Sequence, residues 1–161
     1  MNLYYGVASQ DHLVNSARQV VAKLGGGRNA LILMLGTCAA ETHCASYPDR
    51  HPEKLGVGLG QCDEIALVDV KAHIRPHDSI AMQELGYDIQ NVKLEDLALD
   101  PLLAFAIMRL VYKRKPEPLP SCSDLEAQGR YWKKYYNSAL GAGTASKYVE
   151  EYKNYVPSEF Q

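Results

Sequence analysis

The sequence carries no excess of basic charge, and this limits the polymers it could bind. It has 17 Lys and Arg residues against 19 Asp and Glu residues, a formal net charge of −2. A general nucleic-acid binder shows a basic stripe or patch and a high isoelectric point. The charge balance therefore predicts that nucleic acid is not a partner of this chain.

Long apolar runs are also absent. The longest apolar stretch, residues 30–36, is far shorter than the roughly 20 residues that a membrane-spanning helix needs. Residues 1–6 contain no basic region followed by an apolar run, so no secretory signal is predicted. We expect a protein that is made in a cytoplasm and has no membrane span.

Closely spaced pairs of metal ligands are missing as well. Zinc sites usually contain tight pairs such as Cys-x-x-Cys, and the cysteines here are scattered. Without a secretory signal, such cysteines favour free thiols over a disulfide framework. Neither a metal nor a cofactor is predicted, and a Cys44–His73 protease pair has no supporting local motif. The cysteine and histidine side chains of a type that can bind a metal in residues 38–62 are Cys38, His43, Cys44, His51 and Cys62.

The chain is instead rich in helical patterns. Its 161 residues, 47% hydrophobic and 22% charged, fit one globular domain spanning 1–161. Apolar residues recur at helical spacing, between capping side chains, prolines and glycines. The expected fold class is therefore mainly α, with an irregular loop or a small β-ribbon at 45–62. Helices are expected at 9–23, 28–44, 63–74, 78–85, 100–114, 123–137 and 144–155.

Glu41 is the first candidate for chemistry. Residues 30–35 are apolar on every face, which predicts that 28–44 is the buried central helix. Glu41 lies near the C-terminal end of this helix. An apolar setting raises the pKa of a carboxyl group, which can then stay protonated and act as an acid near neutral pH. The alternative interpretation is a solvated residue at a helix end.

Two further motifs could hold a ligand. Residues 58–61 read Gly-Leu-Gly-Gln; glycine lets a backbone approach a bulky ligand closely, and the Gln61 amide can both donate and accept hydrogen bonds. Residues 135–138 read Tyr-Tyr-Asn-Ser and precede a Gly-Ala-Gly break at 141–143. Helix capping and packing would explain this second motif by themselves. Each motif alone is weak.

Together, the three features resemble the soluble lytic transglycosylases and goose-type lysozymes. In that family a serine follows the glutamate, the loop reads Gly-Leu-Met-Gln, and a late motif reads Ala-Tyr-Asn-Ala-Gly. The matching segments here are Glu41-Thr42, residues 58–61 and residues 136–138. Thr42 stands where the family usually has serine, and Gly60 where it has methionine. Ser46 is near the position of a serine that often follows in the loop.

The wider setting is still more similar to a set of bacteriophage proteins with this domain. They share a Leu-Gly-Thr segment before the glutamate, here residues 35–37, and an acidic residue just after the glutamine, here Asp63. They also share a Tyr-Trp-Lys-x-Tyr-Tyr-Asn segment, here residues 131–137. The resemblance covers roughly residues 28–150.

The resemblance implies a lysozyme-like helical domain that cuts the MurNAc–GlcNAc β-1,4 bond of peptidoglycan. Glu41 would be the catalytic acid and base. The implied partners are peptidoglycan glycan strands and other virion proteins, and the implied location is the phage particle, made in the host cytoplasm and acting in the periplasm or cell wall. The residues implied to bind substrate are Gly58, Leu59, Gln61, Tyr136 and Asn137.

A single glutamate favours a lytic transglycosylase over a hydrolase, because most glycosidases place two carboxylates at set separations. No second carboxylate is forced beside Glu41 by its sequence position. One alternative is a structural virion protein that keeps the fold without turnover, with assembly surfaces on the tyrosine-rich C-terminal helices. Another is an unrelated helical binding module. Candidates for a second carboxylate are Asp49, Glu53, Asp63 and Glu64.

A local basic cluster leaves two interpretations open. Residues 113–115 read Lys-Arg-Lys, and Lys133 and Lys134 follow later. Such charges usually form a solvated loop or helix face. They could instead attract an anionic polymer such as a cell-wall glycan.

Overall fold

A computed structural model of the chain describes residues 2–48, 55–137 and 141–161, and these residues are mainly helical. The expected fold class is thereby confirmed as mainly α, and each expected helix has a counterpart. None of the described helices is long and apolar enough to cross a membrane. The α-helices are α1 (Gln10–Leu24), α2 (Gly27–Thr42), α3 (Glu64–His73), α4 (Pro76–Leu85), α5 (Pro101–Lys113), α6 (Leu125–Trp132) and α7 (Ala145–Tyr155). Shorter helical turns are η1 (Ile89–Asn91), η2 (Leu94–Leu97), η3 (Lys133–Asn137) and η4 (Ser158–Phe160).

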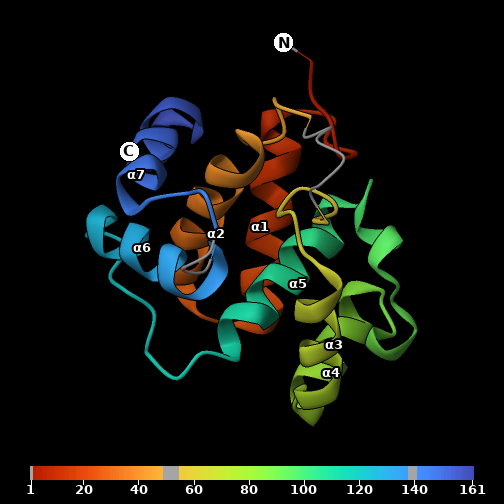
Figure 1. Cartoon of the computed structure of the whole chain (residues 1–161). Coiled ribbons are helices and arrows are strands. Elements are labelled where there is room, and N and C mark those ends of the chain that lie inside the picture. Colours follow the sequence, from red (N-terminus) through yellow and green to blue (C-terminus); the bar gives the residue numbers. More distant parts are fainter. Residues whose placement is uncertain (1, 49–54, 138–140) are drawn as a thin grey trace.

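Helix α2 forms the centre of the molecule, as its apolar composition predicts. Every residue from Ala30 to Ala39 is buried. Helix α2 packs against α1 and α7, and Figure 1 shows α6 and α7 together on one side of it. Helix α5 is a second buried helix, because its residues from Leu103 to Tyr112 are all buried too. Two apolar helices, rather than one, therefore lie at the centre of the core, and the other helices contribute their inner faces to it.

Polar side chains at the N-terminal ends explain where most helices begin. Ser9 and Thr144 accept hydrogen bonds from the backbone three residues on, and so satisfy N–H groups that the helix leaves free. In the sequence, the spacing of Ser123 and Glu126 predicts a capping box at the start of α6. The observed N-cap is instead Asp124, whose side chain accepts a hydrogen bond from Ala127 N at 3.0 Å. The shift of one residue leaves the helix itself in place.

The segment expected to be irregular contains very little β-structure in its described part. Val57 and Cys62 form one antiparallel bridge, with N–O distances of 2.8 and 3.2 Å in the two directions. Residues 49–54 lie outside the described part of the chain. For residues 45–48 and 55–62, the expected β-ribbon therefore reduces to this single bridge around the turn 58–61.

Candidate functional site

Helix α2 ends immediately after Glu41, at Thr42. The next three residues, His43, Cys44 and Ala45, all have left-handed backbone conformations, with φ of 50°, 52° and 72°. The chain thus turns sharply away and leaves the half-buried Glu41 on the last turn of the helix. Non-glycine residues adopt this conformation at a cost, and such strain persists where surrounding contacts hold it.

Thr42 joins the end of α2 to the turn 58–61. Its side chain is fully buried, and its hydroxyl donates to the Leu59 carbonyl at 2.8 Å. The same oxygen lies 3.2 Å from the Cys38 carbonyl. A serine hydroxyl could make these contacts too, so Thr42 supplies the same bonding group as the serine of the family that the sequence resembles. Thr42 therefore positions the turn relative to Glu41.

The turn 58–61 is tightly closed. Gln61 donates twice to the Gly58 carbonyl, from its backbone N at 3.0 Å and from its side-chain Nε2 at 2.9 Å. Gly58 has φ of +79°, and a Cβ there would lie 2.3 Å from the Leu97 carbonyl oxygen, so glycine is required. Leu59 is fully buried. Gly58 and Leu59 thus shape the turn, and the half-buried Gln61 closes it.

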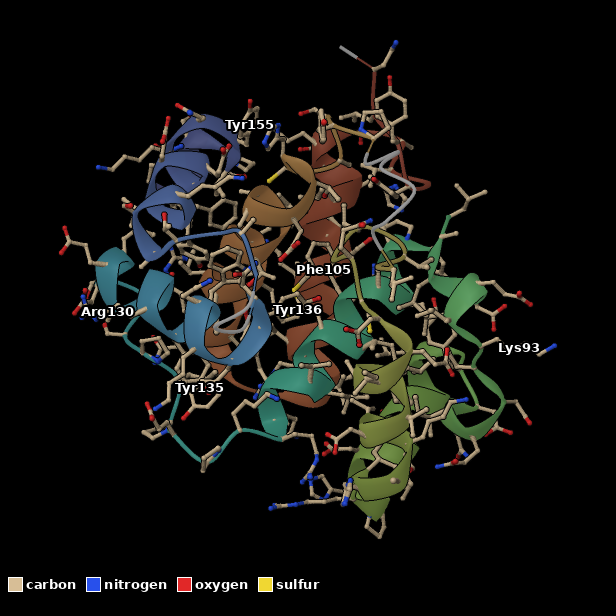
Figure 2. The ribbon with its side chains drawn as sticks, viewed as in Figure 1. Lys93, Phe105, Arg130, Tyr135, Tyr136 and Tyr155 are labelled. Carbon is tan, nitrogen blue, oxygen red and sulfur yellow. The ribbon has the colours of Figure 1, made fainter. Side chains whose placement is uncertain are left out.

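Tyr136 crosses from η3 to the same turn. Its hydroxyl donates to the Gly60 carbonyl at 2.6 Å, and Figure 2 shows Tyr136 near the middle of the molecule. A Cβ on Gly60 would lie only 2.8 Å from this hydroxyl and 2.7 Å from Met108 Cε. The absence of a side chain at position 60 therefore makes room for the tyrosine.

The tyrosine hydroxyls near Glu41 are held in their neutral form. Burial raises the pKa of Tyr136 well above its usual value, and the neighbouring Cys62 and the charge on Glu41 add to the effect. Burial likewise raises the pKa of Tyr112, whose hydroxyl lies 2.7 Å from Thr37 Oγ1. Both hydroxyls therefore keep their protons, and of the two tyrosines only Tyr136 lines the same pocket as Glu41.

Asn137 organises the chain that closes the site. Lys133 Nζ donates to Asn137 Oδ1 at 2.8 Å and to the Gly141 carbonyl at 2.9 Å. Side chains at Gly141 and Gly143 would collide with Asn137 and with Trp132 respectively, at 2.4 Å in each case. The glycine-rich segment after η3 is therefore pressed against these two side chains. Ser138 lies outside the described residues.

A pocket of about 330 Å³ opens where these parts meet, and we refer to it as the Glu41 pocket. Four of the six predicted site residues line it, namely Glu41, Gln61, Tyr136 and Asn137. Gly58 and Leu59 do not line it. The full lining is Ala40, Glu41, Leu55, Gly56, Gln61, Asp63, Trp132, Tyr136, Asn137, Gly141, Ala142, Gly143 and Lys147.

The four candidates for a second carboxylate differ in their position relative to the Glu41 pocket. Asp63 lines the pocket, but its Oδ1 accepts from Ala66 N at 2.8 Å as the N-cap of α3. Glu64 is exposed in the first turn of α3 and does not line the pocket. Asp49 and Glu53 lie outside the described residues. Asp63 is therefore the second carboxylate that the described residues place in this pocket.

Among the lining residues that the sequence does not predict as catalytic or substrate-binding, three have polar or ionisable side chains, namely Asp63, Trp132 and Lys147. Of these, Asp63 is one of the candidates for a second carboxylate. Trp132 is almost fully buried, and among the described residues its Nε1 has no hydrogen-bond partner. Lys147 contributes a cation from α7, and Asp63 a carboxylate from the start of α3. Trp132 belongs to the Tyr-Trp-Lys segment of the family resemblance, and this segment is the sequence signal that could have identified it as a site residue. Nothing in the local sequence around Lys147 marks it.

The alternative constellations do not assemble within residues 2–48, 55–137 and 141–161. No three His, Cys, Asp or Glu side chains there lie close enough to hold a metal ion, and His51 is outside this range. Cys44 and His73 line different pockets, so the protease pair is not formed. All four cysteines are free thiols, and burial raises the pKa of Cys62 to about 12.

Comparisons with known proteins identify no relative of this chain. No protein-family model matches it, and neither a curated protein nor a solved structure is significantly similar.

Proposed function

We propose that this chain cleaves the glycan strands of peptidoglycan, with Glu41 as the proton-transfer group. The observation that carries the proposal is the convergence of Glu41, Gln61, Tyr136 and Asn137 on one pocket from three separate parts of the chain. These residues were singled out by their resemblance to a glycosidase family. Chance matches to a motif would have no reason to line a common cavity.

In the proposed reaction, Glu41 protonates the oxygen that leaves the cleaved MurNAc–GlcNAc bond. It then takes the proton of the MurNAc 6-hydroxyl, whose oxygen bonds to C1 of the same sugar in place of the leaving oxygen and so closes a 1,6-anhydro ring. The side chains of Gln61 and Asn137 position the sugar, because amide groups match sugar hydroxyl and acetamido groups. Since Asp63 is already engaged as a helix cap, a route with one carboxylate is favoured over the two-carboxylate hydrolysis.

Release of soluble muropeptides from sacculi tests this proposal. Purified wild-type protein, Glu41→Gln and a control, Glu126→Gln, are incubated with sacculi, and the products are analysed by mass spectrometry. Glu126 is exposed on α6 and does not line the Glu41 pocket. We expect anhydro-muropeptides from the wild type and the control but not from Glu41→Gln. Hydrated reducing ends would indicate a lysozyme instead, and no release by the wild type would contradict the proposal.

A structural virion protein is the second candidate. Ile65 and Val68 are exposed on one face of α3, at 82% and 54%, and exposed apolar clusters often mark protein interfaces. Tyr148 and Tyr152 of α7 offer no such surface, because both are buried in the core, whereas Tyr155 is half-buried. If wild type released no muropeptides, α3 would therefore be the first face to test for assembly contacts.

A further inference from the structure

A second pocket, of about 270 Å³, lies where three helices end or begin, and we call it the cationic pocket. The end of α3, the start of α4 and the last turns of α5 form its walls, and the chain after α5 closes it with Pro118 and Leu119. Its cationic side chains outnumber its acidic ones. The cations are Arg75, Arg109, Lys113, Arg114 and Lys115, and the acids are Asp78 and Glu117.

Arg109 gives this pocket a buried positive charge. The residue is only 7% exposed, and its Nε donates to the Gly25 carbonyl at 2.8 Å. Among the described residues no carboxylate lies within ion-pair distance of its guanidinium group. Burial lowers the pKa of Arg109, and the more distant Asp78 opposes this effect. A buried cation without a paired anion is costly, so an anionic ligand here would be favoured.

Of the other four cationic side chains of the pocket, two form ion pairs with carboxylates and two do not. Lys113 Nζ lies 2.7 Å from Asp78 Oδ1, and Arg114 pairs with an exposed carboxylate of α3 at 3.0 Å. For Arg75 and Lys115, the described part of the chain provides neither an ion pair nor a side-chain hydrogen bond. Arg75 and Lys115 can therefore turn toward a ligand without breaking an existing pair.

The cationic pocket adjoins the Glu41 pocket through a smaller pocket of about 90 Å³. This smaller pocket shares Gln61, Asp63 and Tyr136 with the Glu41 pocket, and it shares Lys115 with the cationic pocket. The smaller pocket therefore borders both larger pockets. A ligand seated beside Glu41 could extend a branch along them.

We propose that the cationic pocket binds a carboxylate of the short acidic peptides that peptidoglycan carries on its glycan strands. This inference rests on the proposed function, because the strand itself occupies the Glu41 pocket. Guanidinium groups match carboxylates in geometry, and a charge-assisted hydrogen bond is about twice as strong as a neutral one. Inorganic phosphate presents the same kind of anionic oxygens and is the competing source of the ligand.

Calorimetric binding measurements on the full chain test the site. The Glu41→Gln background prevents consumption of the ligand. The ligands are a soluble glycan–peptide fragment with free carboxylates, the same fragment with amidated carboxylates, a neutral N-acetylglucosamine oligosaccharide, and inorganic phosphate. Arg75→Gln with Lys115→Gln is compared with Lys93→Gln and Arg130→Gln, which lie at opposite edges of the molecule in Figure 2 and outside all three pockets.

We expect the Arg75 and Lys115 double variant to bind the charged fragment about tenfold more weakly, as the loss of charge-assisted contacts predicts. The Lys93 and Arg130 variant, and binding of the neutral oligosaccharide, should be unchanged. Equal losses in both double variants would mean a general charge effect and overturn the site. Equally tight binding of the amidated fragment would overturn it too.

The remaining outcomes distinguish a failure of the proposed ligand from a failure of the proposed activity. If phosphate binding depends on Arg75 and Lys115 while fragment binding does not, the pocket is a phosphate site and the peptide assignment is wrong. If the charged fragment binds through these two residues but wild type releases no muropeptides, the proposed activity fails and this site stands. If muropeptides are released with no effect of the double variant on binding, the activity stands and this site fails.

Discussion

The hydroxyl of Thr42 is the most informative single group to remove. Thr42→Val replaces the hydroxyl with a methyl group of similar size, so the core stays filled while the hydrogen bond to the Leu59 carbonyl is lost. A buried carbonyl left without a partner costs about 1–3 kcal/mol. Thr42→Ser keeps the hydroxyl and removes one methyl group, which costs about 1 kcal/mol from transfer and the resulting cavity.

These two costs overlap, so thermal melting alone does not separate the variants. For a chain of this length, 1 kcal/mol corresponds to a shift of roughly 2–4 °C in melting temperature. Muropeptide release does separate them, because the hydroxyl holds the turn that carries Gln61. We expect Thr42→Ser to keep most of the release rate. Thr42→Val should lose on the order of tenfold or more, as small misplacements of positioning groups do.

Three results would refute this reasoning. Equal loss of release in the serine and valine variants would mean that the Thr42 hydroxyl does not position the site. Full activity of Thr42→Val would mean that the turn 58–61 is held by other contacts. Unchanged melting of Thr42→Val would mean that the bond to the Leu59 carbonyl contributes little to folding. Urea unfolding of each variant provides an independent measure of stability.

Three further predictions concern other groups. Gly60→Ala should lower the melting temperature and muropeptide release together, since its Cβ would displace the Tyr136 hydroxyl, and overpacking typically costs about 1–3 kcal/mol. Cys62 should react with iodoacetamide at pH 8 far more slowly in the native protein than in protein unfolded in guanidinium, because its raised pKa of about 12 keeps the thiol protonated. Mass spectrometry of the alkylated Cys62 measures this difference. A hydrogen bond from Arg114 lowers the pKa of Asp69, so Asp69 contributes stability that is present above its unfolded pKa and lost as pH falls through the folded one. Asp69→Asn should therefore cost about 0.2–1 kcal/mol at pH 7, and nothing near pH 2, by urea unfolding.

The helices could be predicted because their signals are local. Ser9, Thr144 and the glycines after α1 mark ends through contacts within one turn of the chain, and an apolar period marks the buried faces. The end of α2 is harder to predict from the sequence. The expected helix ran to residue 44, whereas α2 ends at Thr42. A helix that stops without glycine or proline gives no local warning, because contacts from elsewhere in the fold end it.

The site was predictable only in part, for a similar reason. Glu41, Gln61, Tyr136 and Asn137 could be singled out because a family resemblance connects distant segments, which local patterns cannot do. Trp132 and Lys147 line the pocket through the packing of α6 and α7 against α2, a tertiary arrangement with no sequence period of its own. The cationic pocket combines residues from α3, α4 and α5. In the sequence, its signal is limited to the short basic run at residues 113–115.

The left-handed turn after Glu41 shows how these long-range contacts act on the site. Three consecutive non-glycine residues in this conformation cost about 1–2 kcal/mol each. The first of them, His43, stacks on Tyr155 with ring centroids 4.2 Å apart, and its Nε2 lies 3.3 Å from Glu151 Oε2. Both partners belong to α7. Contacts with α7 therefore help to hold the strained turn, and the turn in turn stops α2 at the point where Glu41 reaches the pocket. The position of the proposed acid thus depends on a helix that begins about a hundred residues later in the chain.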